Sequence, residues 1–86
     1  MRKNIVAGNW KMNTDLADTQ ELIAGLKKIS KTSDAEVIIA PPFTNLYSAF
    51  ETLKDSDIEV AAQNMHQSSS GAFTGEISAA MLKGVG

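Results

Sequence analysis

Cysteine is absent from the sequence, and so are a long apolar run and a net positive charge. Without cysteine the chain can form no disulfide and can do no thiolate chemistry, which leaves its compartment open. The net charge of −2 offers no basic face for nucleic acid. No stretch approaches the roughly 20 apolar residues of a membrane span, and the apolar run after residues 1–3 is too short for a signal peptide. We therefore expect a cytoplasmic protein that binds neither nucleic acid nor membrane.

The composition itself is that of an ordinary globular protein. The 86 residues are 43% hydrophobic and 21% charged, which argues against wholesale disorder. A chain of this length corresponds to one small domain or to part of a larger one. We expect residues 1–86 to form a single segment without an internal boundary.

Three short apolar runs favour β-strands at residues 4–9, 36–40 and 58–63. The second run is almost continuously apolar and β-branched, which is typical of a strand buried on both faces. Pro41 and Pro42 should end it, because proline has no N–H group to donate to a sheet.

Helical patterns follow each of these strands. Thr14 or Asp15 can cap the first helix, Thr44 the second and Ser78 the third, since their side-chain oxygens accept bonds from free N–H groups. Gly25 lies inside the first helix, at a cost of about 1 kcal/mol relative to alanine. The apolar stripe of that helix consists of Leu16, Leu22, Ile23, Leu26 and Ile29. The lysines near its end, where the helix dipole favours cations, are Lys27, Lys28 and Lys31. The second helix presents Leu46, Ala49, Phe50 and Leu53 on one face.

Strands that alternate with helices through short connectors predict a parallel sheet with right-handed crossovers. Three parallel strands would leave two open edges and one uncovered face, and a (β/α)8 barrel removes both by closing on itself. The sequence therefore predicts an α/β fold that consists of the first three β/α units of a (β/α)8 TIM barrel. We expect the barrel to be incomplete, with the chain cut before a fourth strand.

Asn9 and Lys11 come directly after the first apolar run. In an extended segment, residues two apart point to the same side. Ligands of α/β proteins bind at the carboxyl ends of the strands. An amide beside a fixed cation suits a small anionic molecule rich in oxygen. The same spacing also fits a turn asparagine followed by a solvated lysine.

Residues 8–13 (GNWKMN) closely resemble the opening segment of the triosephosphate isomerase family. Residues 62–66 (AQNMH) and 71–78 (GAFTGEIS) resemble that family's third strand and the long loop after it. Two matches in the same order are more specific than one. The resemblance runs over the whole chain and corresponds to the amino-terminal third of the family's sequence.

This resemblance implies an isomerase of glycolysis and gluconeogenesis that interconverts glyceraldehyde 3-phosphate and dihydroxyacetone phosphate through an enediolate, without cofactor or metal. It assigns Asn9 to positioning the substrate. It assigns Lys11 to attracting the phosphate and stabilising the anionic transition state. The family's carboxylate base and histidine electrophile would lie beyond residue 86. We therefore expect the 86 residues alone to be inactive.

Residues 64–76 form a long loop rich in serine and glycine, and loops of that length are usually functional or disordered. Its composition allows a mobile surface loop, yet Met65 and Phe73 are apolar. In the resembling family this loop docks onto the twin subunit of a homodimer, and Thr74 matches the threonine near its tip. The resemblance places Phe73 and Glu76 in the same dimer loop.

Other functions remain possible. One is a non-catalytic βα fragment that associates with itself or with a complementary chain through its open edges and its loop. Another is a generic phosphate-binding α/β domain, which has little support because no glycine-rich loop opens a helix. We interpret His66 as a loop or interface residue and not as the electrophile, because it follows the third strand.

Overall fold

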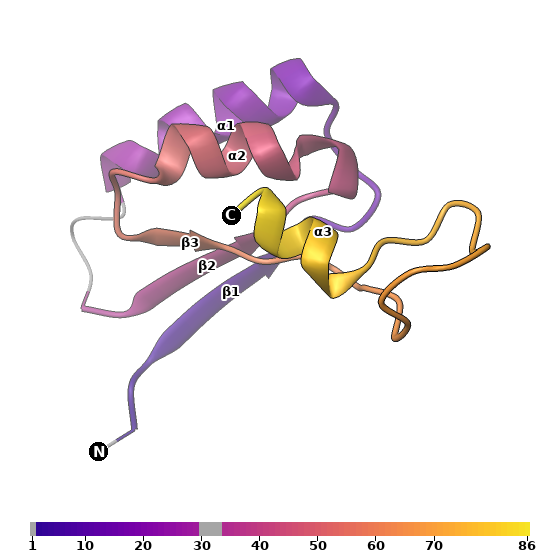
Figure 1. Ribbon diagram of the computed structural model, residues 1–86. Coiled ribbons are helices and arrows are strands. Elements are labelled where there is room, and N and C mark those ends of the chain that lie inside the picture. Colours follow the sequence, from indigo (N-terminus) through magenta and orange to yellow (C-terminus); the bar gives the residue numbers. More distant parts are fainter. Residues whose placement is uncertain (1, 30–33) are drawn as a thin grey trace.

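The computed structural model describes residues 2–29 and 34–86, which form a parallel sheet with helices packed against it (Figure 1). In chain order the elements are β1 (Ile5–Asn9), α1 (Leu16–Ile29), β2 (Glu36–Ala40), the 3-10 turn η2 (Phe43–Asn45), α2 (Leu46–Leu53), β3 (Ile58–Val60) and α3 (Ala79–Gly84). The strands therefore alternate with helices as the apolar periodicity predicts.

The sheet has the strand order β1-β2-β3, and both strand pairs are parallel. Val37 of β2 lies opposite Val6 of β1 on one side and Ile58 of β3 on the other. Within the described residues, β1 and β3 are unpaired along their outer edges, so the sheet is open. This arrangement is consistent with the first βα units of a TIM barrel, as the sequence predicts.

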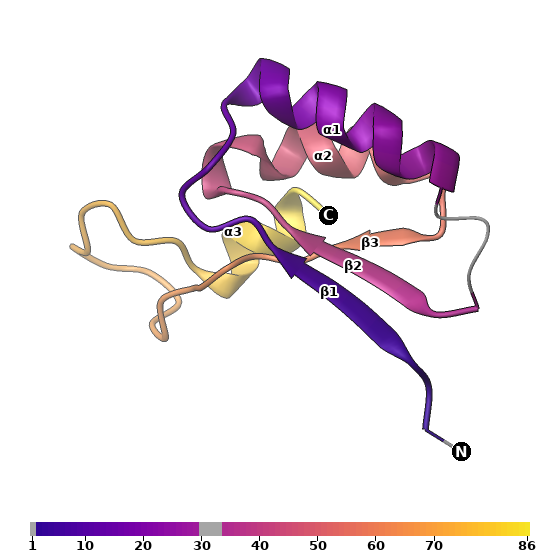
Figure 2. The ribbon, with the colours of Figure 1, turned by 180° about the vertical axis from the view of Figure 1, so that it is seen from behind.

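Helices α1 and α2 lie on the same side of the sheet, as Figures 1 and 2 show from opposite directions. The core forms between these helices and β2 and β3, because each contributes one apolar face to the same layer. Its buried members are Ile23, Ile39, Ala49, Leu53 and Ile58, all 4% exposed or less. Trp10, just after β1, packs against this cluster from the end of the sheet.

The composition of β2 predicts a strand buried on both faces, and this prediction is wrong. Ile39 faces the helices and is buried at 3% exposure, whereas Ile38 on the opposite face is only half-buried. Neighbouring residues of a strand point to opposite faces, and α1 and α2 cover only one of them (Figure 2). The apolar character of Ile38 therefore suits a face that residues 2–29 and 34–86 leave uncovered.

Two of the predicted helix caps are confirmed. The Asp15 Oδ1 atom accepts a hydrogen bond of 2.9 Å from the Asp18 N–H group at the start of α1, so Asp15 fills the role that Thr14 could have taken. The Ser78 Oγ atom accepts one of 3.2 Å from the Met81 N–H group at the start of α3. Lys31, expected near the end of the first helix, lies outside the described residues.

Thr44 does not cap the second helix, contrary to the sequence prediction. It lies inside η2, a turn closed by a 3.0 Å hydrogen bond from the Asn45 N–H group to the Pro42 carbonyl. Asn45 is therefore the residue that precedes α2, and its side chain makes no capping bond.

Strand β3 ends at Val60, short of the predicted range of 58–63, because β2 cannot continue the pairing beyond its own end. The Ala40 carbonyl, at the end of β2, accepts hydrogen bonds from the Trp10 N–H group (3.1 Å) and the Gln63 side chain (2.8 Å). Both acceptor positions of that oxygen are then occupied, and the following Pro41 has no N–H group. The backbone hydrogen bonds between β2 and β3 therefore end here, and the Gln63 side chain makes the next link between the two segments.

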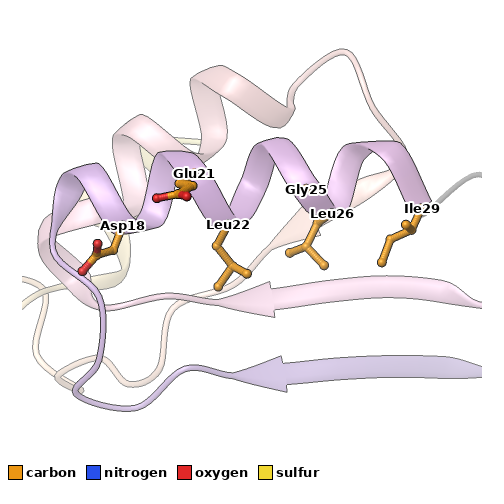
Figure 3. A pocket seen from close by; sticks show the side chains of 6 residues that line it. All are labelled: Asp18, Glu21, Leu22, Gly25, Leu26 and Ile29. Carbon is orange, nitrogen blue, oxygen red and sulfur yellow. The ribbon is translucent and has the colours of Figure 1, made fainter.

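The apolar stripe of α1 is only partly buried. Ile23 is fully buried, but Leu16, Leu22 and Ile29 are 54%, 44% and 63% exposed. Leu22, Leu26 and Ile29 point from α1 toward the side of the strands in Figure 3. With Asp18, Glu21 and Gly25 they line an open groove of about 490 Å³. We call this feature the α1 groove.

Gly25→Ala should stabilise the chain by about 0.5–1 kcal/mol, because alanine is a better helix former than glycine. A Cβ atom at Gly25 would meet nothing within 4 Å. Urea unfolding of the two proteins measures this difference in free energy. A lower midpoint for the variant would mean that the glycine meets a close neighbour in solution.

Candidate functional site

The segment after β1 leaves extended geometry at Lys11, whose φ is 55°. The alternation of side chains along a strand therefore stops at Asn9, where β1 ends. Instead, the Asn9 Oδ1 atom accepts a 2.9 Å hydrogen bond from the Lys11 N–H group. The structure brings the Asn9 side chain to the backbone of Lys11, and the convergence of their two polar heads on a ligand stays a prediction.

The Lys11 backbone is also held at its carbonyl group. The Gln63 Nε2 atom donates to the Lys11 carbonyl at 3.0 Å and to the Ala40 carbonyl at 2.8 Å. One amide thus ties the segment after β3 to the ends of the two other strands. A further side-chain amide, that of Asn13, donates to the Trp10 carbonyl at 2.9 Å.

A second group of polar contacts fixes the far end of the same loop. The Asn45 Nδ2 atom donates to the Thr14 carbonyl at 3.1 Å and to Thr19 Oγ1 at 3.0 Å. Thr19 Oγ1 in turn donates to Thr14 Oγ1 at 2.9 Å. Asn45 and Thr19 are 2% and 0% exposed, so these bonds form away from water. The loop of residues 10–15 is held at both ends.

Lys11 and Asn9 are both exposed at the carboxyl ends of the strands. In the part of the chain that the structure describes, no carboxylate pairs with the Lys11 ammonium, since the ion pairs involve other lysines and His66. The Asn9 Oδ1 atom is occupied by the Lys11 backbone, so its Nδ2 group is the one directed to other partners. Together they offer a cation and a donor, which suits an anion.

The ion pairs among the described residues involve neither Asn9 nor Lys11. The Lys54 ammonium lies 2.8 Å from the Glu51 carboxylate on the solvent side of α2, and the hydrogen bond between them lowers the pKa of Glu51. Across residues 2–29 and 34–86, no three His, Asp or Glu side chains gather to hold a metal ion. No helix in those ranges is both long enough and apolar enough to cross a membrane.

The loop of residues 64–76 projects away from the sheet and helices (Figure 1). At its base the His66 N–H group donates to the Ile77 carbonyl at 2.7 Å. The His66 ring lies against Phe73, with 4.3 Å between ring centroids and 41° between planes. The His66 Nδ1 atom is 3.8 Å from a Glu76 carboxylate oxygen, a contact that becomes an ion pair when the imidazole is protonated. His66 thus acts within the loop, as its position in the sequence suggests.

Thr74 occupies a β-turn in this loop. The Glu76 N–H group donates to the Phe73 carbonyl at 3.1 Å, which places Thr74 and Gly75 at the two central positions. Gly75 has a φ of 83°, as the third position of a type II turn requires. Phe73 is 46% exposed beside this turn. The turn therefore presents Thr74 and one face of an aromatic ring to the outside.

Sequence reasoning gave no site role to Gln63, Asn45 or Thr19. Gln63 could have been found by the rule that located Asn9, because it too lies just after a strand at the carboxyl edge of the sheet. Asn45 stands before an apolar helix and resembles an ordinary cap residue. Its link to Thr14, 31 residues earlier, leaves no trace in the local sequence.

The chain is similar in sequence to known proteins of one family. The family model described as Triosephosphate isomerase matches residues 4–86. The triosephosphate isomerase of Flavobacterium johnsoniae is 55% identical over 87 residues, which cover 100% of this chain and 35% of that protein. The triosephosphate isomerase of Alkaliphilus metalliredigens is 51% identical over 86 residues, again 100% of this chain and 35% of that protein. The chain thus spans about a third of the length of the curated relatives it matches.

Proposed function

Because the chain belongs to the triosephosphate isomerase family, we propose that it supplies the first three βα units of an enzyme that interconverts glyceraldehyde 3-phosphate and dihydroxyacetone phosphate. In this proposal Asn9 positions the substrate, and Lys11 attracts its phosphate and stabilises the anionic transition state. The supporting observation is the Lys11 peptide, fixed through its N–H group by Asn9 and through its carbonyl by Gln63 at the ligand-binding edge of the sheet.

The chemistry explains why a fixed cation matters. Moving a proton between neighbouring carbons creates an enediolate, whose negative charge must be stabilised as it develops. A cation already held in place does this without reorganising during the reaction. The Lys11 ammonium, which pairs with no carboxylate among the described residues, is suited to the task. The reaction also needs a carboxylate base and an electrophile, and we propose that these come from polypeptide that follows these units in the complete barrel.

The proposal also covers assembly. The loop of residues 64–76 would dock onto a second subunit of a homodimer, with Phe73, Thr74 and Glu76 at the contact. Its projection from the domain and the exposed Phe73 support this role. As a member of a glycolytic enzyme family, the protein is expected in the cytoplasm.

The experiment uses this chain in two forms. One is the chain of 86 residues, and the other is a chimera in which it replaces the matching 35% of the Flavobacterium johnsoniae protein. A coupled assay follows dihydroxyacetone phosphate formed from glyceraldehyde 3-phosphate. We expect turnover by the chimera and none by the chain alone. A folded but inactive chimera would contradict the proposed function, and turnover by the 86 residues that Lys11→Ala abolishes would contradict their proposed inactivity.

A second candidate is a βα fragment without catalysis that associates with itself or with a complementary chain. The open edge of β1 offers backbone N–H and C=O groups to a further strand, and the α1 groove is largely apolar, so a partner could cover both. Sedimentation of the 86-residue chain distinguishes the two. A stable self-associated species together with an inactive chimera would favour the fragment.

A further inference from the structure

The loop of residues 10–15 contains two residues in the left-handed backbone region, Lys11 with a φ of 55° and Thr14 with a φ of 76°. In the described ranges they are the only residues other than glycine with a positive φ. This conformation is unfavourable for a lysine and more so for β-branched threonine. Such residues keep it only where the surroundings impose it, and they cluster at functional sites.

Each of these two residues has its carbonyl held by a side-chain amide from another part of the fold. Gln63 donates to the Lys11 carbonyl at 3.0 Å, and Asn45 donates to the Thr14 carbonyl at 3.1 Å. The donors come from after β3 and from the start of α2, while the loop follows β1. The same device thus acts twice in one short loop.

The Asn45 side chain bonds to the loop of residues 10–15 and does not cap α2, the helix that it precedes. It stands immediately before α2, where an asparagine side chain ordinarily accepts a bond from the first turn, yet it makes no such bond. Its Nδ2 group has two protons, and one goes to Thr14 and the other to Thr19. Its Oδ1 atom accepts from Thr44 Oγ1 at 3.3 Å. A buried side chain that caps nothing and holds a strained neighbour is placed to position that neighbour.

We propose that Asn45 and Gln63 are positioning residues for Lys11. By holding the carbonyls of Thr14 and Lys11, they keep both residues left-handed and so fix where the Lys11 ammonium stands. This inference rests on the proposed function for its consequence in catalysis, but its structural part does not. Without the two amides the loop would relax toward ordinary backbone conformations, and the cation would lose its fixed place.

The structural part is tested by NMR on the 86-residue chain. The three-bond coupling between the amide and α protons of Lys11 and Thr14 reports φ. We expect Asn45→Ala to shift the coupling of Thr14 and, through the same loop, that of Lys11 away from left-handed values. We expect Gln63→Ala to shift the coupling of Lys11 in the same way. Gln63 is exposed, so its variant retains the core even where Asn45→Ala unfolds the chain. Left-handed couplings that persist in Gln63→Ala, and in Asn45→Ala where that variant folds, would overturn the proposal.

The matched control is Gln20→Ala. Gln20 bonds to Ser48 and Thr52 between α1 and α2, so this change also removes partly buried polar contacts but leaves the loop untouched. Rescue is a further test. Glycine adopts a positive φ without penalty, so adding Thr14→Gly to Asn45→Ala should return Lys11 toward its original coupling. If Gln20→Ala also changed the Lys11 and Thr14 couplings, the effect would not be specific to Asn45 and Gln63.

The catalytic consequence is measured in the chimera. A displacement of about 1 Å can cost about 10²-fold in rate, so we expect Asn45→Ala to lower kcat by up to that factor while Gln20→Ala leaves it unchanged. An inactive parent chimera would defeat the proposed function and leave the NMR result to decide the positioning. An active chimera in which Asn45→Ala and Gln63→Ala both match Gln20→Ala would defeat the positioning alone.

Discussion

Replacing Lys11 with alanine in the chimera should lower kcat/KM by about 10²–10³-fold, the usual cost of removing one group that stabilises developing charge. The side chain is exposed and pairs with no carboxylate in the described residues, so the change should barely alter the free energy of unfolding. Steady-state kinetics together with urea unfolding separates these two effects. Because Lys11 is proposed to act on the phosphate and on the transition state, both KM and kcat should change.

Lys28→Ala is the matched control for that variant. Lys28 is also exposed, but it lies in the last turn of α1 at the other end of the sheet from the loop. The Lys28→Ala variant loses the same charge without touching the site, so any fall in its kcat/KM measures the effect of the protein's overall charge. Equal losses for Lys11→Ala and Lys28→Ala would contradict a specific role for Lys11.

The fold was predictable because its elements leave periodic traces in the sequence. Short apolar runs gave β1 and β2 to within a residue, because an apolar run of this length bounded by polar or turn residues favours a strand. Ser78 marked the start of α3 because a free N–H group needs a nearby oxygen. These are local requirements, and local sequence carries them.

The site was predictable only in part, because its geometry depends on contacts between distant segments. Asn9 and Lys11 were found from their place after a strand, but their spacing predicted an extended backbone. The structure instead has Lys11 left-handed, under the influence of Gln63 from 52 residues later. A pattern of period two cannot anticipate such a turn, because a side chain from another element selects the conformation.

The same limit explains the errors at β2 and β3. Ile38 has the composition of a buried residue, but its burial needs a layer on the far face of the sheet that these residues do not supply. The predicted end of β3 failed because pairing depends on the partner strand, which stops at Ala40. Sequence thus predicts what a segment favours, whereas the surroundings decide how far it extends.

Ile23→Ala should destabilise the 86-residue chain by about 2–5 kcal/mol, the range for removing a fully buried isoleucine side chain to the β-carbon. Ile23 is 0% exposed and lies at the centre of the cluster formed by α1, α2, β2 and β3. The total stability of a natural domain is about 5–15 kcal/mol, and an open sheet with one uncovered face belongs near the low end. Urea unfolding followed by circular dichroism measures the change, and a loss below 1 kcal/mol would show that this core does not form as described.

Leu22→Ala is the control, and it also tests what covers the α1 groove. Leu22 is the preceding residue of the same helix but is 44% exposed, so its truncation in the 86-residue chain should cost much less than that of Ile23. In the chimera, where further polypeptide is attached, any helix that packs into the groove would bury Leu22. The cost of Leu22→Ala should then rise toward that of Ile23→Ala. Equal small costs in both proteins would mean that the groove stays open, and the apolar stripe of α1 would then need a partner from outside the chain.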